Sequence, residues 1–137
     1  MPDRVFLDAN IFVYAQDAGA PAKQRKSREI IAQLAASGNG IVSTQVLQEF
    51  FVAATRKPGV APVAAKGVLK TLAVFEIVQV SPALIHEAVD CSILNQLSFW
   101  DSLILAAAAS AGCGTVLSED LNASQAILGV KIRNPFA

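Results

Sequence analysis

The sequence has 137 residues, a length that fits one domain with a hydrophobic core of its own. Hydrophobic residues make up 53% of the chain, but the longest apolar run, residues 103–109, is far shorter than the roughly 20 residues that a transmembrane helix needs. The 11 basic and 11 acidic residues cancel, so bulk charge alone does not hold this chain on a nucleic acid. We therefore expect a single domain over residues 1–137, with no membrane segment and with apolar surface that a partner covers.

Strand-like apolar runs and helical periodicity alternate along the chain. In chain order, the pattern predicts a strand at residues 4–7, helices at 9–16 and 22–37, a strand at 41–43, helices at 45–55 and 62–72, a strand at 75–78, helices at 82–97 and 99–111, and strands at 115–117 and 131–133. Such alternation is typical of a mainly parallel sheet with helices on both faces. We therefore expect an α/β fold with a central sheet of four to five strands.

Four acidic residues stand where this fold would bring them together. Asp8 and Asp120 come just after predicted strands, Glu49 lies in an apolar stretch of helix, and Asp101 opens the most apolar helix. In open parallel sheets, sites form outside the carboxyl ends of the strands, so these acids are expected to converge. Clustered carboxylates repel one another, and a hard divalent cation is the usual resolution. The leading interpretation is therefore a metal-dependent hydrolase.

Each acid also has a purely structural interpretation. Asp8 could cap the helix that follows it, and Ser98 with Asp101 fits a capping box. Glu49 could lie at the margin of an amphipathic helix, and Asp120 could belong to an exposed acidic turn. Because one topology places all four at the same edge of one sheet, the joint interpretation is stronger than any single one.

Other kinds of site lack the residues they need. The chain has one histidine, His86, and no G-x-S-x-G nucleophile motif, and its two cysteines, Cys91 and Cys113, form no C-x-x-C pair. Widely spaced cysteines indicate reduced thiols and a cytoplasmic location. A phosphatase of the aspartyl-phosphate type needs a second aspartate where this chain has Asn10, and the acid pair and late lysine of a receiver domain are not apparent.

Five segments carry a family resemblance. They are VFLDAN at residues 5–10, STQVLQEF at 43–50, WDSLILA at 100–106, LSEDL at 117–121 and VKIRNPF at 130–136. The first four, in this order and spacing, resemble PIN-domain ribonucleases. The fifth is similar to the ending of many VapC toxins of toxin–antitoxin pairs. The resemblance covers nearly the whole chain and is specific as a set, although each segment is short.

The resemblance implies a compact three-layer α/β/α domain that cuts RNA with Mg²⁺ or Mn²⁺. It implies that Asp8, Glu49, Asp101 and Asp120 are the catalytic acids, and we expect Asp8, Asp101 and Asp120 to hold the metal ion. It implies supporting roles for Asn10, Thr44 (or Ser43) and Ser118, and it implies a homodimer and an antitoxin that blocks the site. The alternative is a catalytically inactive PIN-like binding module.

One residue departs from the family pattern. Many relatives carry a further acid two residues after the one that matches Asp120, where this chain has Asn122. Because an amide is a neutral ligand, a second metal ion would be held more weakly, so the resemblance supports one-metal chemistry better than two-metal chemistry.

Basic residues should flank an acidic cleft that binds RNA, and the pair Arg56 and Lys57 is among the candidates.

Overall fold

The computed structural model describes residues 3–122 and 126–137 of the chain. The helices in these ranges are α1 (Ala9–Ala15), α2 (Pro21–Ser37), α3 (Thr44–Arg56), α4 (Pro62–Thr71), α5 (Pro82–Asn95) and α6 (Phe99–Ser110), with a short 3₁₀ helix, η1 (Leu72–Val74). The strands are β1 (Val5–Leu7), β2 (Gly40–Ser43), β3 (Glu76–Val78), β4 (Thr115–Leu117), β5 (Ala126–Ile127) and β6 (Val130–Arg133).

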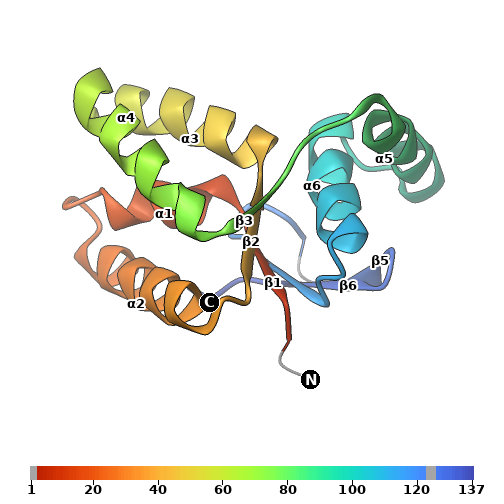
Figure 1. Ribbon diagram of the computed structural model, residues 1–137, viewed down its shortest axis with the longest axis horizontal. Helices are drawn as coiled ribbons and strands as arrows, with labels where there is room; N and C mark the ends of the chain where they lie inside the picture. The colour runs from red at the N-terminus through yellow and green to blue at the C-terminus, as the bar shows by residue number, and fades with distance from the viewer. Residues whose placement is uncertain (1–2, 123–125) are drawn as a thin grey trace.

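The described strands form one sheet in the order β3-β2-β1-β4-β6-β5, in which only β5 and β6 pair antiparallel. Helices α1 to α4 cover one face of the sheet, and α5 and α6 cover the other (Figure 1). The predicted three-layer α/β/α fold with a mainly parallel sheet is therefore confirmed.

The sheet has one strand more than the four to five predicted. The additional strand, β5, spans only Ala126–Ile127 and turns into β6 through Leu128 and Gly129, whose φ angles are 56° and 76°. A tight hairpin turn of this kind usually carries Asn-Gly or Asp-Gly. Because leucine stands at the first turn position, the sequence gives no hairpin signal here.

The central part of helix α6 lies against the sheet with almost no solvent contact. All seven residues from Ser102 to Ala108 are buried, as the apolar run at residues 103–109 predicts for most of them. Its hydrophobic character is therefore that of a core helix packed against β2, β4 and β6. No helix within residues 3–122 and 126–137 is long and apolar enough to cross a membrane.

The parallel strands bring distant parts of the chain to one edge of the sheet. Leu7 at the end of β1 pairs with Leu117 at the end of β4, and the next amide, that of Asp8, donates a hydrogen bond to the Leu117 carbonyl at 3.1 Å. The residue after each strand, Asp8 or Ser118, therefore emerges beside the other at the carboxyl edge, where α1 and α3 also begin.

Candidate active site

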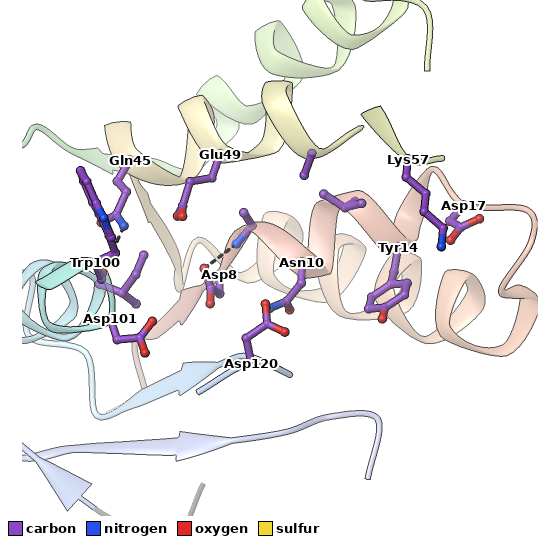
Figure 2. A pocket seen from close by; sticks show the side chains of 14 residues that line it. Asp8, Asn10, Tyr14, Asp17, Gln45, Glu49, Lys57, Trp100, Asp101 and Asp120 are labelled. Carbon is purple, nitrogen blue, oxygen red and sulfur yellow. Dashed lines mark hydrogen bonds between the residues drawn. The ribbon is translucent and has the colours of Figure 1, made fainter. Parts of the chain in front are cut away.

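A cleft of about 480 Å³ opens at this carboxyl edge. Asp8, Glu49, Asp101 and Asp120 all line it, and their side chains point toward a common space between β1, α3 and α6 (Figure 2). The remaining lining residues are Ala9, Asn10, Val13, Tyr14, Asp17, Gln45, Ala53, Lys57, Trp100 and Ile104. The fold thus gathers four carboxylates that lie far apart in the sequence.

Asp8 is the buried member of the set. Its Oδ1 accepts a hydrogen bond from the Ala9 amide at 2.8 Å, and its Oδ2 accepts one from the Ser118 hydroxyl at 2.7 Å. It is also the N-cap residue of α1, so the capping interpretation and the cleft interpretation both apply. Burial raises the pKa of Asp8, the two hydrogen bonds oppose this, and the nearby Asp120 and Asp101 charges raise it further.

Ser118 connects Asp8 to the Asp120 loop. The Ser118 hydroxyl is fully buried and accepts hydrogen bonds from the Asp120 amide at 3.2 Å and the Leu121 amide at 3.3 Å. Asn10 donates to the Ser118 hydroxyl at 3.3 Å and to Asp120 Oδ2 at 3.0 Å, while its own oxygen accepts from the Glu119 amide. Asn10 and Ser118, which the resemblance implied as supporting residues, therefore form one network with Asp8 and Asp120.

Asp101 enters the cleft from the opposite helical layer. The Ser98 hydroxyl caps α6 by accepting a hydrogen bond from the Asp101 amide at 3.0 Å, which is half of the capping box considered from the sequence. Within the described residues, the Ser98 amide does not donate a hydrogen bond to the Asp101 carboxylate, so the other half of the box is absent. The Asp101 carboxylate lines the cleft and is partly exposed there.

Glu49 faces the same space from α3. Partial burial of its carboxyl group, followed by the negative charges of Asp8 and Asp101, raises the pKa of Glu49 to about 7, although Gln45 acts in the opposite direction. The side chain as a whole is exposed, so solvent screens part of this interaction. A carboxyl group that titrates near neutral pH can accept or release a proton under physiological conditions.

Thr44 lies outside the cleft. Its hydroxyl accepts a hydrogen bond from the Val80 amide at 3.2 Å and so holds the segment after β3. The alternative residue, Ser43, is buried and caps α3 by accepting from the Val46 amide at 3.4 Å. Of the supporting residues expected from the resemblance, the structure brings Asn10 and Ser118 to the acids and leaves Thr44 and Ser43 at the strand-to-helix junction.

Several cleft residues were not named as site residues from the sequence: Tyr14, Asp17, Gln45, Lys57 and Trp100. Two of them carried a signal, because Gln45 precedes Glu49 by about one helical turn and Trp100 precedes Asp101 directly. Lys57 belongs to a basic pair that was expected near RNA, and it supplies positive charge at one end of the cleft (Figure 2).

Glu119, next to Asp120, is held away from the cleft. It accepts hydrogen bonds from Lys23 and from the Tyr14 hydroxyl, each at 2.7 Å. Burial would raise the pKa of Glu119, but these two donors outweigh it and lower the pKa. Both partners lie outside the set of acids, so the Glu119 carboxylate stays partly exposed and does not line the acidic cleft.

The donor atoms of the cleft fit a hard divalent cation. Within residues 3–122 and 126–137, no three His, Cys, Asp or Glu side chains are gathered tightly enough to form a ready-made metal centre. All four acids nevertheless offer carboxylate oxygens, the ligands that Mg²⁺ prefers, and Mg²⁺ usually takes only one or two carboxylates directly and keeps several waters. Burial is the main cause of the raised pKa values of Asp8 and Glu49, and a cation there would relieve the repulsion between carboxylates that adds to it.

Comparison with known proteins identifies the family. A model of the PIN domain matches residues 5–126. A search of curated protein sequences found no match.

Three solved structures are similar over most of their length. A toxin–antitoxin complex from Klebsiella pneumoniae has 17% identity and a TM-score of 0.71, covering 96% of this chain and 97% of that one. DNA-bound VapBC from Salmonella typhimurium has 18% identity and a TM-score of 0.69, covering 98% and 99%. VapC20 of Mycobacterium tuberculosis, a toxin that cleaves the sarcin–ricin loop, has 22% identity and a TM-score of 0.65, covering 82% and 86%.

At these identities the similarity shows a shared fold. The family model spans most of the sequence, and the fold agrees with that of the three structures. On these two grounds, the chain belongs to the PIN-domain family.

Proposed function

We propose that this protein is an endoribonuclease that hydrolyses RNA phosphodiester bonds with the help of Mg²⁺ or Mn²⁺. The observation that carries the proposal is the gathering of Asp8, Glu49, Asp101 and Asp120 in one cleft, from four separate parts of the chain. Membership of the PIN-domain family, whose members are generally nucleases that depend on divalent metals, supports the same reaction class.

The cleft residues would have different roles in phosphodiester hydrolysis. Asp8, Asp101 and Asp120 would hold the divalent ion, which when bound offsets phosphate charge and lowers the pKa of water. Ser118 fixes the orientation of the Asp8 carboxylate, and Asn10 fixes that of Asp120. Glu49, whose carboxyl group lines the same cleft from α3, is placed to accept the proton of the attacking water.

We also propose that the protein is the toxin of a toxin–antitoxin pair, with an antitoxin partner, a homodimeric state and a cytoplasmic location. Similar structures from Klebsiella and Salmonella are complexes of such pairs. The molecule exposes apolar side chains that partners would cover: Ile85, Val89 and Ile93 recur every four residues along α5.

The test is RNA cleavage by purified protein with added Mg²⁺ or Mn²⁺, compared with the variants Asp8→Asn and Asp101→Asn. Both variants should stay folded, as judged by circular dichroism, and should lose metal-dependent cleavage. The matched control is Asp17→Asn, which removes a carboxylate that lines the same cleft but bonds to the Gly19 amide. Full activity in Asp8→Asn or Asp101→Asn would contradict the assignment.

The second candidate is a PIN-like module without catalytic activity. The presence of all four carboxylates disfavours this alternative, because their mutual repulsion is unfavourable and an inactive module would gain nothing that offsets it. Calorimetric titration with Mn²⁺ separates the two, since an inactive module should show no metal binding that depends on Asp8. Sequencing of RNA ends after brief expression, with Asp8→Asn as control, would then identify the RNA that is cut.

A further inference from the structure

A second pocket, of about 490 Å³, opens directly beside the acidic cleft. The two share Gln45, Glu49, Ala53 and Trp100, and the second pocket adds Gln48, Val52 and Arg56. Its volume is that of a small-ligand site. A chain molecule whose reacting group lies in the acidic cleft would therefore place its neighbouring unit in this pocket.

Trp100 forms a wall between the two pockets. Trp100 is the only tryptophan in the chain and directly precedes Asp101. Its side chain is 63% exposed, although it is large and apolar. Its ring is in contact with Phe99, edge to face, with centroids 5.0 Å apart, and its backbone carbonyl accepts a hydrogen bond from Gln45 at 3.1 Å. A large aromatic side chain that is held in place but left open to solvent is a surface on which a flat ligand can stack.

Gln45 supplies a second, independent indication of a ligand. The residue is 3% exposed, and its Oε1 atom is buried with no hydrogen-bond partner among the described residues. Leaving a buried carbonyl oxygen unpaired is unfavourable, and in native proteins such atoms are usually satisfied by a protein group, by ordered water or, at a pocket, by a ligand. Gln45 borders both pockets, so a ligand that bridges them can donate to this oxygen once the Gln45 amide turns outward.

Arg56 adds a positive charge to the second pocket, at the side away from the Glu49 carboxylate that the two pockets share. It is the last residue of α3, about two helical turns after Glu49, and it lines the second pocket but not the acidic cleft. An arginine suits a phosphate group, which it can bind through two parallel hydrogen bonds. The pocket thus combines an aromatic face, a buried unpaired acceptor at its wall and a cation, with the Glu49 carboxylate on the side of the acidic cleft.

We propose that this second pocket is the subsite for the nucleotide that flanks the scissile phosphate of single-stranded RNA. The base stacks on Trp100, a hydroxyl or amino hydrogen of the nucleotide donates to Gln45 Oε1, and Arg56 binds the flanking phosphate. This assignment rests on the proposed ribonuclease function and adds the site that positions the substrate. Since every base has an aromatic face, the stacking contact favours unpaired nucleotides over a duplex.

The first test uses the fluorescence of Trp100 and needs no cleavage. Asp8→Asn protein in metal-free buffer is titrated with short oligoadenylate and oligouridylate, and binding is followed in parallel by polarisation of labelled RNA. We expect saturable quenching of the tryptophan emission. Arg56→Gln should weaken binding and reduce its salt dependence, whereas Arg25→Gln, on the exposed face of α2, should change neither. RNA binding without any quenching would overturn the proposal.

The second test compares Trp100→Ala with Trp100→Phe, which keeps an aromatic face. From the typical strength of base stacking, Trp100→Ala should weaken RNA binding about 5- to 100-fold. Trp100→Phe should restore most of it. In cleavage assays the loss should fall mainly on KM. Equal binding by both variants and the parent protein would refute the subsite.

The two proposals fail separately. If RNA quenches Trp100 but the parent protein cleaves nothing with either metal, the ribonuclease function falls and the binding site stands. If the protein cleaves RNA but neither quenching nor the Trp100→Ala effect appears, only the subsite falls.

Discussion

Ser118→Ala tests whether the hydroxyl at the centre of the site stabilises the buried Asp8 carboxylate. Ser118 donates to Asp8 Oδ2 at 2.7 Å, a distance typical of a hydrogen bond to an ionised acceptor. Removing a hydrogen bond to a charged group costs about 1.5–3 kcal/mol. The amides of Asp120 and Leu121 lose an acceptor as well. We therefore expect Ser118→Ala to lower the free energy of unfolding by about 2–3 kcal/mol.

Ser27→Ala is the matched control. Ser27, in α2, is also fully buried, but its hydroxyl has no hydrogen-bond partner among the described residues. A buried hydroxyl without a partner is unfavourable by about 1–3 kcal/mol, so its removal should be neutral or stabilising despite the small cavity. The two variants make the same chemical change, a serine to alanine at zero exposure. Their changes in the free energy of unfolding should have opposite signs or differ by at least about 2 kcal/mol.

The measurement is urea unfolding in the presence of a chelator, with the free energies compared only if the m values agree. Because the Ser118 hydrogen bond favours ionised Asp8, its contribution is present at alkaline pH and is lost as pH falls through the pKa of Asp8. The difference between the parent protein and Ser118→Ala should shrink accordingly. If Ser27→Ala is as destabilising as Ser118→Ala, the hydrogen-bond argument for the site is wrong.

Two further predictions concern charge and packing. The pKa of Glu49 is about 7 in the folded protein against 4.5 ordinarily, so its contribution to stability is full at low pH and is lost as pH rises through about 7. Without metal, the free energy of unfolding of Glu49→Gln should equal that of the parent near pH 4.5 and exceed it at alkaline pH by about 1 kcal/mol, after allowance for solvent exposure. A difference in thermal unfolding that stays constant across this pH range would contradict the shift. Gly40→Ala would place a Cβ 2.7 Å from the Phe75 ring and should cost about 1–3 kcal/mol, whereas Gly67→Ala, with open space in α4, should gain about 0.5–1 kcal/mol; denaturant midpoints that rank the other way would refute the packing argument.

The positions of the acids followed from sequence because they depend on topology. A carboxylate just after a strand, such as Asp8, must emerge at the carboxyl edge of a parallel sheet whatever the side-chain packing. Asp101 was identified for a different reason, since an acid at the start of an otherwise apolar helix is unusual. Neither inference required knowledge of any contact between distant residues.

Features that depend on contacts between distant residues were missed. Glu119 lies in a polar turn, and nothing local indicates that Lys23, 96 residues away, neutralises it. The unpaired oxygen of Gln45 is visible only when the neighbours of that atom are known. At the strand-to-helix junction, one residue of register decides which way Thr44 points. The sequence alone did not decide between Thr44 and Ser43, and the structure turns the Thr44 hydroxyl to Val80.

The placement of the acids on both helical layers has a mechanical consequence. Glu49 belongs to α3 on one side of the sheet and Asp101 to α6 on the other, while Asp8 and Asp120 follow the strands between them (Figure 1). An ion shared by these groups would act as a cross-link through the thickness of the domain. When the ion binds, amide hydrogen exchange should therefore slow in both helical layers at once, whereas an ion that orders a single loop would slow exchange only there.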